Sequence, residues 1–142
     1  MRLAADRCED LLRASDHGVL TTLHPDRGVD AVPTCFVVDP TTRAVAIPVD
    51  RVKPKASVDL QRTRNLDHDP RAALLCEHWD RSEWSTLWWV RTSMVRATVD
   101  PGRRAEFESL LRLKYPQYEG HTFADLLAFR ITQIVGWSAS PV

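Results

Sequence analysis

Short β-rich runs alternate with strong turn signals along most of this 142-residue chain, and this pattern limits the fold more than any other feature. His24–Gly28 contains Pro-Asp-Arg-Gly, in which proline presets φ and Gly28 can adopt a positive φ. Pro33 cannot donate to a ladder, so its strand should have an edge or a bulge there. We predict a meander of three strands near the N-terminus, over Val19–Leu23, Val29–Val38 and Arg43–Val49.

The remainder of the chain predicts three more strands with helices between them. The strands are expected at Arg71–His78, Leu87–Val99 and Phe129–Trp137, the last with Phe129, Ile131, Val135 and Trp137 on one face. Helices are expected over Leu3–Ser15, from a cap at Ser57 to Leu66, and from a cap at Asp100 to Pro116, with a loop over Gln117–Asp125. The sequence therefore predicts one mainly β (α+β) domain over residues 1–142, a six-stranded antiparallel barrel, closed or nearly closed, with two or three peripheral helices.

The charge balance and the cysteines exclude several functions. Nineteen basic and nineteen acidic residues give a formal net charge of zero, which argues against non-specific binding to nucleic acid or membrane. No apolar run approaches a membrane span or a signal core, so we expect a cytoplasmic protein. Cys8, Cys35 and Cys76 are too few and too far apart for a zinc site or a disulfide framework, and each is expected to be a small buried hydrophobe.

One stretch of the neutral chain is strongly basic. Between Arg51 and Arg64 there are five basic residues and one acid, Asp59. Lys53 and Lys55 lie where the third strand should give way to a helix, and a helix start adds free N–H groups and the positive end of its dipole. This pattern indicates a phosphate or carboxylate site, with Arg51 and Arg64 as secondary contacts and Arg62 facing solvent; a solvated charged face is the alternative.

Four of the five tryptophans fall within eleven residues, at positions 79, 84, 88 and 89. Adjacent tryptophans in a strand point to opposite faces, so one of Trp88 and Trp89 can pack in the core while the other faces a pocket or a partner subunit. Large core residues are the alternative for each of them. The histidines show no metal-ligand spacing, and no nucleophile or general-base motif is present, so any redox or transfer chemistry would belong to a cofactor.

Several segments together resemble the pyridoxamine-phosphate-oxidase-like split β-barrel proteins. They are Val32–Phe36, Asp50–Lys55, Arg64–Leu66, Asp69–Arg71, Trp84–Arg91 and Lys114–Tyr118. The Lys-Pro-Lys, Trp-Trp-Val-Arg and Tyr-Pro-Gln-Tyr pieces are similar to the actinobacterial subgroup that uses the deazaflavin coenzyme F420. The resemblance spans essentially the whole chain.

The resemblance implies a homodimer with its cofactor in a groove between two barrels. By similarity, Lys53 and Lys55 would bind the cofactor phosphate and its acidic tail. Pro33, Thr34 and the backbone of Pro48, Val49 and Asp50 would lie along the deazaflavin ring, and Trp88 or Trp89 of the other subunit would close the site. The implied function is F420-dependent hydride transfer involving an unsaturated small molecule.

Met94 departs from the glycine usual near this position in these relatives, and Ala56–Val58 is less basic than their helix starts. An FMN-binding oxidoreductase on the same fold is therefore the first alternative. A non-catalytic cofactor carrier, or a dimer whose groove is only a packing interface, is the second.

Overall fold

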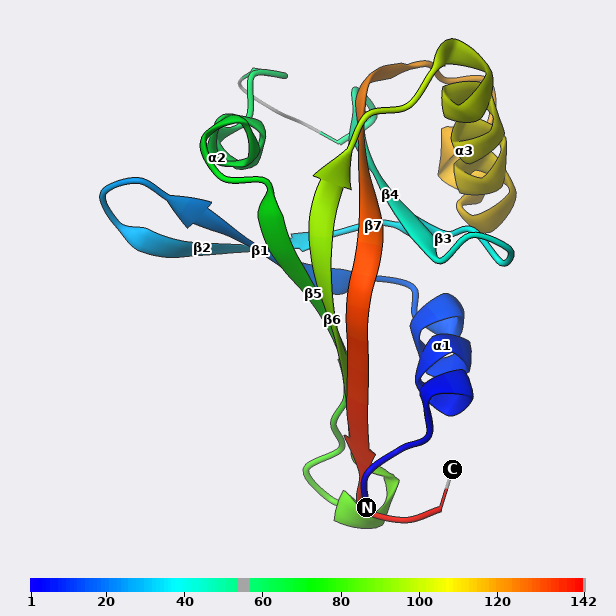
Figure 1. The fold of residues 1–142 in the computed structure, drawn as a ribbon. Helices are drawn as coiled ribbons and strands as arrows, with labels where there is room; N and C mark the ends of the chain where they lie inside the picture. The colour runs from blue at the N-terminus through cyan, green and yellow to red at the C-terminus, as the bar shows by residue number, and fades with distance from the viewer. Residues whose placement is uncertain (54–56, 142) are drawn as a thin grey trace.

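The computed structural model describes residues 1–53 and 57–141, and the described strands form one antiparallel sheet in the order β2-β1-β5-β6-β7-β4-β3 (Figure 1). The expectations for Lys55 and for Ala56 fall outside the described residues. The strands are β1 (Gly18–His24), β2 (Gly28–Thr34), β3 (Val37–Val38), β4 (Ala44–Asp50), β5 (Arg71–His78), β6 (Trp88–Ala97) and β7 (Phe123–Ser138). The helices are α1 (Ala5–Ala14), α2 (Gln61–His68) and α3 (Pro101–Lys114), with short 3-10 turns η1 (Trp84–Thr86) and η2 (Pro116–Tyr118). The mainly β class is confirmed.

The sheet has seven strands in its described part where the sequence predicted six, because the run Val29–Val38 is divided. β2 ends at Thr34, Cys35 and Phe36 leave the ladder, and β3 pairs with β4 at the opposite edge of the sheet. Pro33 thus lies in an edge strand, as its missing N–H predicted. No pairing joins β2 to β3 in the described strands, so the barrel is not closed. We call the junction between these two edges, spanned by Cys35 and Phe36, the seam.

Two hydrophobic clusters hold the helices against the sheet. The larger one packs α1 side chains such as Leu12 against inward side chains of the strands, including Leu20, Leu74, Val90 and Phe129. The smaller one packs Phe107 and Leu111 of α3 against the other face of β4 and β7. The outer face of β1, β5 and β6 carries a shallow hollow of about 360 Å³, and small side chains such as Thr21, Ala73 and Ser93 contribute to its lining.

A bulge in β7 overturns the predicted face of the last strand. Ser93 pairs with Gln133 and Met94 with Ile131, so Thr132 is an extra residue in β7. Before the bulge, Phe129 and Ile131 are buried; after it, Gly136 and Ser138 are buried and Trp137 is exposed. Val135 and Trp137 therefore do not share the inward face of Phe129, because one extra residue reverses the alternation.

The helix caps are partly as predicted. Asp100 caps α3 and accepts the N–H of Arg103 at 2.8 Å, with Pro101 as the first helical residue. Ser57 does not cap α2, which begins at Gln61; the Ser57 hydroxyl accepts the N–H of Asp59 at 3.0 Å instead. The predicted loop after Pro116 is shorter than expected, because η2 and the start of β7 at Phe123 occupy much of it. Among the described residues no helix has the length and apolar character needed to cross a membrane.

Gly136 is required by close packing between β7 and α1. A Cβ there would lie 2.9 Å from both the Cys8 sulfur and the Trp89 carbonyl oxygen. Because one of these atoms is backbone, we expect Gly136→Ala to lower the free energy of unfolding by about 1–3 kcal/mol. Urea denaturation of the two proteins measures this. Gly102→Ala, whose Cβ would meet only the Asp100 carboxylate at 3.3 Å, is the control and should cost nothing measurable. Equal midpoints for Gly136→Ala and the native chain would contradict the packing argument.

Candidate functional site

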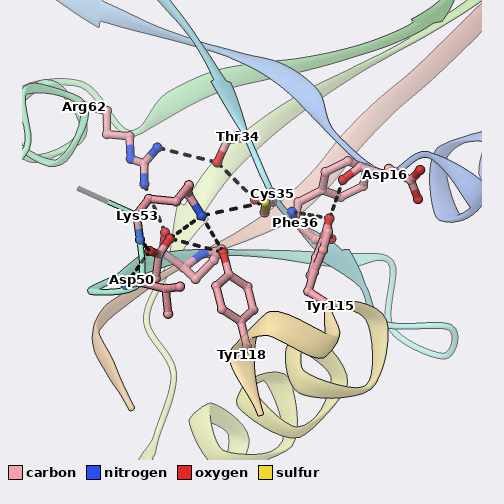
Figure 2. A network of polar contacts seen from close by, with 11 residues as sticks. Asp16, Thr34, Cys35, Phe36, Asp50, Lys53, Arg62, Tyr115 and Tyr118 are labelled. Atoms are coloured by element: carbon pink, nitrogen blue, oxygen red, sulfur yellow. Dashed lines mark hydrogen bonds and ion pairs between the residues drawn. The ribbon is translucent and has the colours of Figure 1, made fainter. Parts of the chain in front are cut away.

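A cavity of about 220 Å³ lies beside the seam and is lined by Pro33, Thr34, Cys35, Pro48, Asp50, Lys53, Arg62 and Tyr118. These residues come from the end of β2, the seam, β4, the segment after β4, α2 and η2. Larger hollows lie over the outer sheet face and beside residues 96–99, at the end of β6. We take the smaller cavity as the candidate site because a nucleophilic thiol, a lysine, an arginine and a tyrosine meet there (Figure 2).

Asp50 organises the turn that leads out of β4. It is 2% exposed and lies at a register shift between β4 and β7. Its Oδ1 accepts the backbone N–H groups of Val52 at 3.1 Å and of Lys53 at 3.0 Å. Its Oδ2 accepts the Tyr118 hydroxyl at 3.1 Å and lies 2.6 Å from the Lys53 ammonium. The carboxylate therefore folds the backbone and fixes the lysine at the same time.

The Lys53 ammonium lies near three other side chains of the site, those of Asp50, Tyr118 and Cys35. Its Nζ lies 2.8 Å from the Tyr118 hydroxyl and 3.9 Å from the Cys35 sulfur (Figure 2). The Lys53 side chain is 54% exposed, so its ammonium reaches both the cavity and solvent. Burial, followed by the neighbouring Cys35 and Asp50, raises the pKa of Tyr118, so its hydroxyl stays protonated at neutral pH.

Arg62 lines the cavity, and the prediction that it faces solvent was wrong. It donates to the Pro48 carbonyl at 3.0 Å and to the Thr34 hydroxyl at 3.5 Å. Its Nε is buried and has no hydrogen-bond partner in the described part of the chain. In the helix, Arg62 shares a face with the buried Asn65 and Leu66, three and four residues on, which directs it inward. Burial lowers the pKa of Arg62, yet a guanidinium remains charged at neutral pH.

The other predicted site residues are distributed as follows. Pro33, Thr34, Pro48, Asp50 and Lys53 all line the cavity. The Val49 side chain is buried in the core, and the expected place of its backbone along the ring stays a prediction. Arg64 is half-exposed and pairs with Asp59 at 2.9 Å, while Arg51 is exposed, and neither lines the cavity. Lys55 lies outside the described residues.

Trp88 lies elsewhere in the same chain. It stacks on His78 with ring centroids 6.4 Å apart and lines a separate hollow of about 360 Å³ with Trp79 and Trp89. β6 begins at Trp88, at the bottom of Figure 1, whereas α2 and the end of β4, which contribute residues to the cavity, lie toward the top. Trp79 and Trp84 beside it are 61% and 65% exposed.

Cys35 and Tyr118 are lining residues to which the sequence reasoning gave no role. Cys35 was expected to be buried, but it is only partly so. Tyr118 ends the Tyr-Pro-Gln-Tyr motif, and that motif was the available signal. Its first tyrosine, Tyr115, accepts the Phe36 N–H at 3.1 Å, and the same hydroxyl lies 2.7 Å from the Asp16 carbonyl oxygen. The two tyrosines thus hold the seam and the cavity against the end of α3.

Several solved structures superpose on this chain over nearly all of its length. A conserved hypothetical protein from Mycobacterium tuberculosis superposes with a TM-score of 0.74 at 17% identity, covering 96% of this chain and 86% of that one. An FAD-binding protein from Mesorhizobium loti gives 0.69 at 14% identity over 96% and 95% of the chains. A protein assigned as a pyridoxamine 5'-phosphate oxidase from Corynebacterium glutamicum gives 0.62 at 13% identity over 97% and 98%.

The chain shares its fold with these three proteins. No family model and no curated protein matches the sequence. The superpositions establish the architecture. The F420 subgroup remains a prediction from the sequence motifs.

Tyr115→Phe tests whether the tyrosine hydroxyl holds the seam. The change leaves the N–H of the fully buried Phe36 without its acceptor, so we expect a loss of about 1–3 kcal/mol in the free energy of unfolding. Urea denaturation measures it. Ser109→Ala is the matched control, since it removes an exposed hydroxyl from α3 and should change stability by less than about 0.5 kcal/mol. Equal losses in the two variants would refute the role of Tyr115.

Proposed function

We propose that this chain is an oxidoreductase that binds a flavin-type cofactor through its phosphate at the seam cavity. The observation that carries the proposal is the convergence of Lys53 and Arg62 on one cavity. The FAD-binding and pyridoxamine-phosphate-oxidase proteins of the same fold support the cofactor class. Such a cofactor supplies hydride transfer, which no side chain of the cavity can supply alone.

The lining groups fit a phosphate. The cavity has two cations, Lys53 and Arg62, and one carboxylate, that of Asp50. The carboxylate already accepts from two backbone N–H groups, Tyr118 and Lys53. The buried Nε of Arg62 lacks a partner in the described chain, and a phosphate oxygen would satisfy it. Lys53 and Arg62 would hold the anionic end, and the Thr34 and Tyr118 hydroxyls would orient it.

The cavity is too small for a whole cofactor. Pockets for ligands of this size usually measure about 300–1,000 Å³, against about 220 Å³ here. The ring system would therefore extend past Pro33 and Pro48 onto the surface. We propose that a second copy of the chain supplies the remaining wall, and that its tryptophan-rich end brings Trp88 or Trp89 to the ring. The open outer face of β1, β5 and β6 supports this arrangement.

The cofactor is either FMN or FAD, as the structural relatives favour, or F420, as the Trp-Trp-Val-Arg and Tyr-Pro-Gln-Tyr motifs favour. Fluorescence titration of the purified protein with each of the three compounds distinguishes them. Tight binding of FMN or FAD identifies a flavin oxidoreductase, and tight binding of F420 identifies a deazaflavin reductase. Failure of all three to bind would overturn the proposal. Binding without turnover of any unsaturated acceptor would favour a carrier.

Two arginines of α2 provide a matched test of the phosphate site. Arg62→Gln removes a cation from the cavity, whereas Arg64→Gln removes one from the surface of the same helix. We expect Arg62→Gln to weaken cofactor binding about tenfold or more, and Arg64→Gln to change it by less than about twofold. Fluorescence titration gives both dissociation constants, with thermal melts to verify folding. Equal effects of the two changes would place the phosphate elsewhere.

The second copy is tested by disturbing the outer sheet face. Ala73 lies opposite Thr21 on one side and Ser93 on the other, which forms a row of small residues across three strands. We expect the native protein to sediment as a dimer and Ala73→Arg to sediment as a folded monomer with weaker cofactor binding. Leu113→Arg, at an 84% exposed position on α3, should leave the dimer intact. A monomeric native protein would refute this part of the proposal.

A further inference from the structure

The three cysteines of the chain occupy different environments. Cys8 and Cys76 are 0% and 1% exposed. Burial raises the pKa of Cys8, and it raises the pKa of Cys76 to about 11. Buried thiols of this kind are inert toward reagents in water. Cys35 differs because it is partly exposed and lines the seam cavity.

The position of Cys35 is fixed on both sides. The Thr34 hydroxyl donates to the Cys35 carbonyl oxygen at 3.0 Å. The next residue, Phe36, is held by the Tyr115 hydroxyl, and the Lys114 ammonium donates to the Phe36 carbonyl at 2.9 Å. The thiol is therefore presented from one fixed point of the cavity wall (Figure 2).

The charges around the thiol favour an anionic reagent. The Lys53 ammonium lies 3.9 Å from the sulfur, and the Arg62 guanidinium lines the same cavity. The opposing carboxylate of Asp50 is 3% exposed at its side chain and turned toward Tyr118, Lys53 and two backbone N–H groups. An anionic molecule that enters the cavity thus meets two cations and a nucleophilic sulfur.

We propose that Cys35 is a modification site at which a small anionic disulfide forms a mixed disulfide and thereby blocks the cavity. The predicted block of cofactor binding rests on the proposed function, since the added group and the cofactor phosphate would compete for Lys53 and Arg62. The thiol chemistry itself does not depend on the cofactor.

The exchange step balances without any further reagent. The thiol loses its proton to solvent, and the thiolate sulfur of Cys35 attacks one sulfur of the small disulfide. The new sulfur–sulfur bond forms as the old one breaks, and the other half leaves as a thiolate. Cys35 is oxidised, the departing half is reduced, and an added small thiol reverses the reaction.

Dithiobis(nitrobenzoate), an aromatic disulfide with two carboxylates, is a direct probe because it releases a coloured thiolate. We expect one thiol of the native protein to react rapidly and the two others to react only in denaturant. In Cys35→Ser the rapid phase should be absent, while two thiols still react in denaturant. The proposal would be overturned if no thiol of the native protein reacts rapidly, or if a thiol of the Cys35→Ser variant still does.

The role of charge is measured with a second probe, the uncharged dipyridyl disulfide. Lys53→Met should slow the dicarboxylate reagent about fivefold relative to the neutral one, because one unit charge near 4 Å is lost. Arg64→Gln, outside the cavity, should leave the ratio of the two rates unchanged. An unchanged ratio in Lys53→Met would refute selection for anions. Thermal melts verify that the variants fold.

The consequence for binding is measured separately. Native protein carrying the mixed disulfide should bind its cofactor at least about tenfold more weakly, and dithiothreitol should restore binding. Unchanged binding by the modified protein would refute the blocking step. If the unmodified protein binds none of FMN, FAD and F420, the proposed function fails, and the thiol rates still decide whether Cys35 is the reactive site.

Discussion

The buried carboxylate of Asp50 is the interaction on which the candidate site depends. A charge at 2% exposure must be compensated, and within residues 1–53 and 57–141 four donors contact this one. Two of them are backbone groups that turn the chain after β4, and the other two are Lys53 and Tyr118. The internal acid thus keeps the lysine in place before any ligand arrives. Little side-chain entropy then remains to be lost when an anion binds.

The turn-separated β pattern predicted most of the fold. β1, β4 and β5 lie within a residue or so of their predicted spans, and Pro33 lies on an edge strand as its missing N–H required. Gly28 has a φ of 91°, as the hairpin signal indicated. These features depend on local chemistry, and local chemistry can be read from a sequence. The missed division of Val29–Val38 lies at Phe36, whose N–H donates to Tyr115, a residue distant in sequence.

The candidate site shows the same division between local and distant causes. Five of the predicted residues meet in one cavity because they flank two strand ends that the fold brings together. Arg62 was misjudged because its direction depends on where α2 begins, and no capping side chain marks that point in the sequence. Cys35 and Tyr118 could not be paired from the sequence, since 83 residues separate them and only the seam brings them to one lysine.

The extra residue Thr132 divides β7 into two halves with different roles. Its first half presents Phe129 and Ile131 inward and supports the end of the sheet that carries the cavity. Its second half presents Gly136 to α1 and supports the end that carries the tryptophans. The bulge changes which residues of β7 face inward, from odd-numbered positions before it to even-numbered positions after it. If Thr132 were paired in a regular ladder instead of bulging, the alternation from Phe129 would turn Trp137 toward the space that Gly136 leaves for Cys8. The bulge therefore lets one strand present the correct side chains at both ends of the molecule.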